Sequence, residues 1–86
     1  MYIHLGQETV IKSKDVIGIF DLETTTISKN TRLFLEKAEK NKEVETVSYE
    51  LPKSFIICSS EKRKQKVYIS QISSSTLLKR SEVLYK

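Results

Sequence analysis

Few residues of this sequence have the chemistry of a catalytic or metal site. The chain contains one histidine, His4, and one cysteine, Cys58, and neither stands in a motif of a nucleophilic site. Its glycines, Gly6 and Gly18, are too few for a phosphate-binding loop. The early acidic residues lack the spacing of an acid–base pair or a calcium loop: Glu8, Asp15, Asp21 and Glu23. We therefore expect a protein that is not an enzyme, with no catalytic residue, metal, cofactor or small-molecule substrate.

A basic segment, "EKRKQK" at residues 61–66, is the most distinctive cluster. Lys62, Arg63, Lys64 and Lys66 surround a predicted turn between two apolar strands. Basic side chains on a protruding hairpin can reach phosphate groups, and a two-stranded ribbon fits the DNA major groove. The same residues are also typical of a solvated turn or of a site for an acidic protein partner. The residues alone leave these three interpretations open.

Charge is unevenly distributed along the chain. Residues 1–52 contain seven Lys or Arg and nine Asp or Glu, a balance of −2, whereas residues 53–86 contain eight and two, a balance of +6. A positive surface attracts nucleic acid through nonspecific Coulomb forces. The sequence shows neither a signal peptide nor eighteen consecutive apolar residues, so we expect a cytoplasmic protein without a membrane partner.

The 86 residues fit a single domain, 1–86, whose own core is small. Residues 2–12 are predicted to form a β-hairpin that turns at Gly6, followed by a short helical turn over 13–16. Residues 17–22 form a predicted strand that is apolar on both faces. Such a strand is central in a sheet, or its second face meets another subunit.

The second half of the pattern predicts two helices and three strands. A helix is expected over about 29–41, with Ser28 as N-cap and Asn41 in the left-handed C-terminal position. Its apolar stripe comprises Ile27, Phe34, Leu35 and Ala38. Residues 44–51 read as a strand, 53–70 as a hairpin around the basic segment, and a short helix follows a cap at Ser73. We therefore predict an α+β domain with an antiparallel-rich β-sheet, one central helix and a short C-terminal helix.

Almost the whole chain resembles the extracellular matrix regulatory protein family, and its RemB-like branch most closely. The segments that carry the resemblance are "MYIHLG", "KDVIGIFDLETTT", "SKNTRLFL", "PKSFIIC" and "VYISQISSSTLLKR". The resemblance implies a cytoplasmic bacterial regulator of biofilm matrix genes with a fold similar to LytTR-type DNA-binding domains. In the sister branch, RemA, subunits form ring-shaped oligomers that bind double-stranded DNA, so the resemblance also implies a homo-oligomer.

Residue by residue, the resemblance transfers little of the sister branch's basic surface. Lys53 matches an arginine before the penultimate strand, whereas Glu50, Leu51 and Pro52 replace its basic neighbours, and Asp15 stands near another arginine position. We expect an oligomeric DNA-binding regulator, with a structural or protein-interaction module as the alternative. The candidate nucleic-acid-binding residues are Lys53, Lys62, Arg63, Lys64 and Lys66, and further Arg32, Lys79 and Arg80.

Overall fold

The computed structural model describes residues 2–22, 28–59 and 64–84. The elements in chain order are β1 (Tyr2–Gly6), β2 (Thr9–Lys12), the 3-10 turn η1 (Ser13–Asp15), β3 (Val16–Asp21), α1 (Lys29–Lys40), β4 (Val44–Thr46), β5 (Ser54–Ser59), β6 (Gln65–Ser70) and α2 (Ser74–Leu84). β1 and β2 form an antiparallel hairpin. The other strands form a sheet in the order β3-β5-β6-β4, in which β4 runs parallel to β6 and the other pairs are antiparallel. The predicted α+β class is confirmed.

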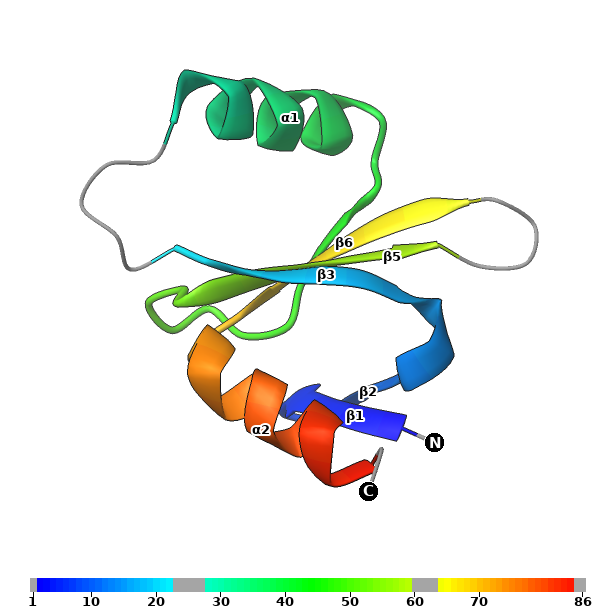
Figure 1. Ribbon diagram of the computed structural model, residues 1–86. Helices are drawn as coiled ribbons and strands as arrows, with labels where there is room; N and C mark the ends of the chain where they lie inside the picture. Colours follow the sequence, from blue (N-terminus) through cyan, green and yellow to red (C-terminus); the bar gives the residue numbers. More distant parts are fainter. Residues whose placement is uncertain (1, 23–27, 60–63, 85–86) are drawn as a thin grey trace.

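The four-stranded sheet separates two layers (Figure 1). Helix α1 covers one face, and the β1–β2 hairpin with α2 covers the other. β5 supplies both cores because its side chains alternate: Phe55 joins Ala38 and Val67 on the α1 side, whereas Ile56 and Cys58 join the core on the hairpin side. In the described residues, neither helix is long and apolar enough to cross a membrane.

The N-terminal hairpin is tied to the sheet through its turn and through Ser70. Ile3 and Leu5 are buried while Tyr2 and His4 are exposed, as the alternation predicts. Gly6 has a φ of 118°, and a Cβ at this position would lie 2.8 Å from Nε2 of Gln71. The Ser70 hydroxyl donates to the Leu5 carbonyl oxygen at 2.6 Å. The positive φ of Gly6 is a conformation that favours glycine, and the Gln71 side chain packs against this turn.

Helix α1 begins as predicted and ends one residue differently. The Thr31 N–H donates to Oγ of the N-cap Ser28 at 3.1 Å. At the other end the N–H groups of Lys42 and Glu43 bond to the carbonyls of Glu39 and Ala38, which is the Schellman pattern. The left-handed residue of this motif is Lys42, with φ 58°, whereas Asn41 has φ −84°. The prediction of a left-handed Asn41 was wrong. Asn41 is the C-cap of the helix, and the left-handed residue of the Schellman motif is the next one, Lys42.

The strand predicted over residues 44–51 is shorter in the structure. β4 ends at Thr46, and the Val47 N–H still bonds to the Ile69 carbonyl before the chain turns away. The Ser48 hydroxyl then accepts the Glu50 N–H at 3.2 Å, a local turn that competes with strand pairing. Ile27, which we predicted for the apolar stripe of α1, lies outside the described residues.

Candidate nucleic-acid interface

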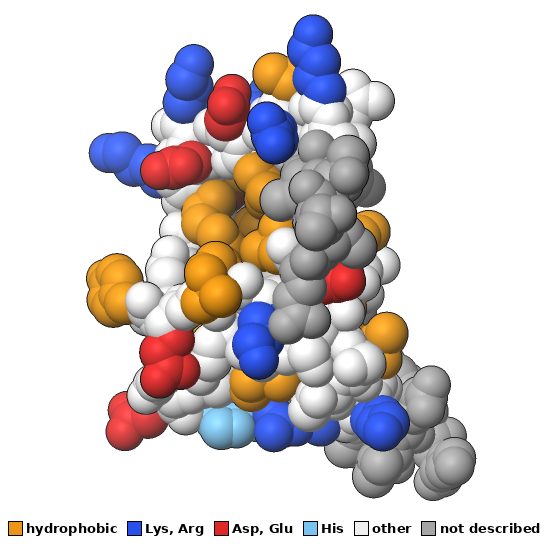
Figure 2. Space-filling view, turned by 90° about the vertical axis from the view of Figure 1, so that its left-hand side faces the viewer, with side chains coloured by type: hydrophobic (Ala, Val, Ile, Leu, Met, Phe, Trp, Pro, Cys, Tyr) orange, Lys and Arg blue, Asp and Glu red, His pale blue; other side chains and the backbone are white. Residues whose placement is uncertain are grey.

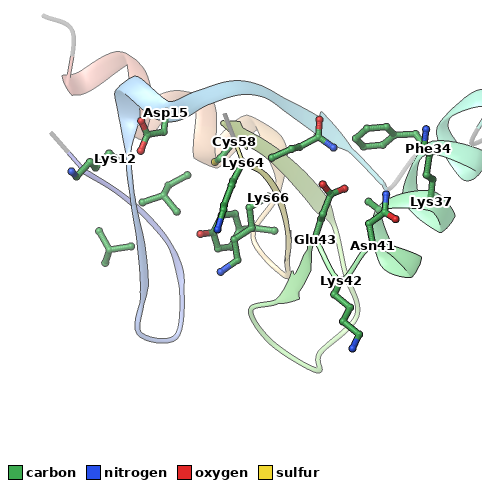
Figure 3. A pocket seen from close by; sticks show the side chains of 15 residues that line it. Lys12, Asp15, Phe34, Lys37, Asn41, Lys42, Glu43, Cys58, Lys64 and Lys66 are labelled. Atoms are coloured by element: carbon green, nitrogen blue, oxygen red, sulfur yellow. The ribbon is translucent and has the colours of Figure 1, made fainter. Parts of the chain in front are cut away.

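A groove of about 1120 Å³ lies beside the N-terminal end of β6 (Figure 3). Strand β2 borders it on one side and the C-terminal end of α1 on the other, with β6 between them. The charged side chains that line it are five lysines and two acids: Lys12, Lys37, Lys42, Lys64, Lys66, Asp15 and Glu43. The groove is therefore a net positive concave surface built from segments far apart in sequence.

The lysines reach the groove for different structural reasons. Lys37 lies on the last turn of α1, and Lys42 is held beside it by the left-handed end of the helix. Lys12 ends β2, whereas Lys64 directly precedes β6 and is exposed. Positive charge at a helix C-terminus also interacts favourably with the helix dipole. The helix end thus stabilises the same charges that it presents to the groove.

Lys66 is the most constrained of these cations. Its Nζ lies 2.9 Å from Oε1 of Glu45, and 5.2 Å from the centroid of the Tyr68 ring. Glu45 is the register partner of Tyr68 across the parallel β4–β6 pair. The hydrogen bond to Glu45 is the main cause of a raised pKa for Lys66. The lysine remains protonated at neutral pH, but part of its charge is compensated within the protein.

Cys58 lines the same groove but is a poor nucleophile. It is buried, and burial together with the nearby Asp15 raises the pKa of the thiol to about 11. A reactive cysteine instead needs a lowered pKa and access to solvent. Burial also raises the pKa of the neighbouring Tyr68 hydroxyl. These two side chains give the groove a partly apolar floor.

The structure brings together only some of the predicted DNA-binding residues. Lys64 and Lys66 line the groove, whereas Lys62 and Arg63 lie outside the described residues. Lys53 precedes β5 at the end of the sheet opposite Lys64, about 20 Å away at roughly 3.3 Å per strand residue. Lys53 and the groove therefore do not form one compact site.

The remaining candidates lie on the two helices. Arg32 is exposed on α1, and Lys79 is exposed on α2. Nη1 of Arg80 donates to the His4 carbonyl oxygen at 2.7 Å, so this guanidinium fastens α2 to β1. The His4 ring donates through Nε2 to the Gln7 carbonyl oxygen, also at 2.7 Å. Both Arg80 and His4 thus contribute contacts within the fold.

Sequence reasoning missed three groove residues, Lys12, Lys37 and Lys42. Lys37 lies in the predicted helix and Lys42 just after it, and Lys12 lies in the predicted hairpin, so none of them belongs to the basic segment. No local signal relates the end of β2 to β6, because only packing of the hairpin against the sheet brings them together. Among the described residues, no group of three or more His, Cys, Asp or Glu side chains is placed to hold a metal ion.

Comparison with known proteins decides the family. No protein-family model matches the chain. The chain is 38% identical to Extracellular matrix regulatory protein B of Bacillus subtilis (strain 168), and the match covers 100% of this chain and 96% of the relative. The chain belongs to the extracellular matrix regulatory protein B family. The resemblance to the RemB-like branch is thereby confirmed.

In this member of the extracellular matrix regulatory protein B family, the segment "ISQISSST" has a structural role. The buried Ser70 joins β6 to β1, and its Oγ also accepts the Ile72 N–H at 3.0 Å. Oγ of Ser73 accepts the Thr76 N–H at the start of α2, at 3.3 Å, as the predicted N-cap does. This segment therefore specifies the junction between the sheet, the hairpin and α2.

Proposed function

We propose that the protein is a nonenzymatic, cytoplasmic regulator of extracellular-matrix genes that binds double-stranded DNA as a homo-oligomer. The relative's name describes a regulatory protein of the extracellular matrix, and the match extends over the whole chain. The observation that carries the DNA-binding part is the groove, in which five lysines face two acidic side chains. Lys64 and Lys66, which belong to the basic segment 61–66, line this groove.

Phosphate contact is the chemistry that suits these residues. Lysine is a flexible point charge that binds phosphate without reading the base sequence. Lys64 and Lys42 are exposed and lie on opposite sides of the groove entrance, while Lys66 is partly neutralised by Glu45. A single copy offers few phosphate contacts, so affinity gains strongly when several copies bind the same duplex. We therefore propose nonspecific backbone contact by each subunit and avidity through assembly.

A salt titration of binding to a generic DNA duplex tests the proposal. We expect a steep loss of affinity with salt, and we expect the double variant Lys42→Gln/Lys64→Gln to lower the logarithmic slope by about 2 per subunit, at roughly 0.9 for each phosphate contact. The matched control is Lys29→Gln/Lys79→Gln, which removes two exposed charges outside the groove. Equal losses in both variants would show that only net charge matters. A native protein that does not bind DNA at low salt would refute the proposal.

The alternative is a protein-interaction module that assembles without binding DNA. It is favoured by exposed apolar and aromatic side chains, above all Tyr49 at 99% and Leu51 at 80% exposure. Figure 2 shows hydrophobic side chains gathered across the middle of one face, with basic side chains around α1 above them. A native protein that does not bind DNA at low salt, together with loss of self-association or of binding to a protein partner in Tyr49→Ser, would favour this alternative.

A further inference from the structure

Strand β3 is the long open edge of the four-stranded sheet. It pairs with β5 on one side, and in the described part of the chain no strand pairs with its other side. The opposite edge, β4, has three residues, whereas β3 has six. A long edge strand presents backbone donors and acceptors to a further strand, and proteins usually protect such edges with charges or proline. β3 has no charged residue or proline between Val16 and Phe20.

The side chains of β3 are also apolar and accessible. Ile17 is 64% exposed and Phe20 is 42% exposed. The Phe20 ring stacks on Phe55 with centroids 4.9 Å apart, and it lies only 2.6 Å from where a Cβ on Gly18 would be. Gly18 thus leaves room for the ring to lie flat along the strand. The result is an apolar edge whose one charged residue, Asp21, stands at its last position.

We infer that β3 pairs antiparallel with β3 of a second copy, joining two sheets about a two-fold axis. The backbone direction supports this pairing. The Leu22 N–H bonds to the Lys53 carbonyl at 2.8 Å, so Leu22 and, by alternation, Phe20 direct their backbone groups toward β5. Ile19, the residue before Phe20, by the same alternation directs its N–H and carbonyl away from β5. Two such residues from two copies can exchange a pair of hydrogen bonds.

Self-complementarity fixes the most favourable register. Centring the axis on Ile19 places Gly18 opposite Phe20 of the second copy and Ile17 opposite its Asp21, so no like charges face each other. Centring the axis on Gly18 instead places Asp15 opposite Asp21, where like charges repel each other. The Ile19-centred register is therefore preferred. A second copy is the occupant that fits, because its β3 offers the same apolar edge.

This inference rests on the oligomeric part of the proposed function and names the surface that forms the subunit contact. Pairing two subunits in this way doubles the number of basic grooves in one particle. Affinity for a long polyanion then rises without any new type of contact. The assembly itself needs no DNA, so it can be tested separately from DNA binding.

Sedimentation equilibrium of the full chain without DNA is the test. We expect Ile17→Asp to weaken self-association at least tenfold relative to the native protein, because residue 17 lies opposite Asp21 of the second copy in the Ile19-centred register and the two carboxylates repel each other. The matched control is Leu33→Asp on α1, where the native side chain is 53% exposed, and we expect it to associate like the native protein. Circular dichroism of both variants checks that they remain folded. A native protein that stays monomeric, or an Ile17→Asp variant that associates normally, overturns the inference.

Hydrogen exchange at the Ile19 amide distinguishes strand pairing from any other dimer. This N–H points away from its own sheet and is protected only if a second strand accepts it. We expect slow exchange in the associated native protein and fast exchange in Ile17→Asp. Fast exchange of the Ile19 amide in an associated native protein would place the contact elsewhere. Normal association with weak, salt-independent DNA binding would instead retain this inference and refute the proposed function.

Discussion

Replacing Glu45 by glutamine should strengthen DNA binding, because Glu45 competes with phosphate for Lys66. The two side chains form an ion pair at 2.9 Å, and they are 47% and 43% exposed. An accessible pair of this kind is worth about 0.2–1 kcal/mol. A phosphate that approaches Lys66 must replace that interaction. Glu45→Gln keeps the shape of the side chain and removes its charge.

The expected gain follows from that energy. Releasing about 0.2–1 kcal/mol corresponds to roughly 1.4- to 5-fold tighter binding, at tenfold per 1.4 kcal/mol. If Lys66 then contacts phosphate, the logarithmic salt slope increases by about 0.9. The pKa of Lys66 should fall at the same time, because the hydrogen bond that Lys66 donates to Glu45 is the largest cause of its raised value. NMR titration of the Lys66 side chain measures this change without DNA.

Fluorescence anisotropy with a labelled duplex, repeated at several salt concentrations, measures affinity and slope together. Glu36→Gln is the matched control, since it removes one exposed acidic charge from α1 outside the groove. Equal gains in DNA affinity for Glu45→Gln and Glu36→Gln would show that only the change in net charge matters. A lowered Lys66 pKa without any gain in affinity would show that Lys66 does not contact phosphate.

Two further predictions concern stability. Burial raises the pKa of Cys58 from 9.0 to about 11, so unfolding releases the thiol proton between these values and the free energy of unfolding falls as pH rises from about 9 to 11. The largest loss of unfolding free energy that this shift allows is about 2.7 kcal/mol, at 1.36 kcal/mol per pKa unit. Urea unfolding at pH 8 and at pH 10.5 measures it, and the free energy should decline less between these pH values for Cys58→Ala than for the native protein. Ser70→Ala should lower the free energy of unfolding by about 1–3 kcal/mol, because it leaves the Leu5 carbonyl and the Ile72 N–H without this hydroxyl. Thermal unfolding measures the loss, and a comparable loss in Thr46→Ser, at an exposed strand position, would contradict the assignment to a buried hydrogen bond.

Local sequence pattern predicted most of the elements. Alternation placed Ile3 and Leu5 inside the hairpin, and the Ser28 N-cap was identified correctly. These features depend on residues only a few positions apart, so a short stretch of sequence is enough to predict them. The end of α1 was missed by one residue because two competing positions, Asn41 and Lys42, differ only in the hydrogen bonds that close the helix.

The order of the strands was beyond the reach of such patterns. β4 pairs parallel to β6, although β5 lies between them in sequence, and β3 is an edge although its apolar composition suits a central strand. A strand's apolar faces indicate that it is covered, but they do not say whether by its own chain or by another copy. The sheet order places β3 at an edge, and this is the edge that we propose for self-association.

By itself, the sequence determined the α+β class, the hairpins, the helix start and the concentration of positive charge after residue 52, because each follows from composition or from short-range periodicity. Only the tertiary structure placed Lys12, Lys37 and Lys42 beside Lys64 in one groove, paired Lys66 with Glu45, and separated Lys53 from them. Coulomb interactions depend on distance through space, and the distances between these residues are set by how the hairpin and α1 pack on the sheet.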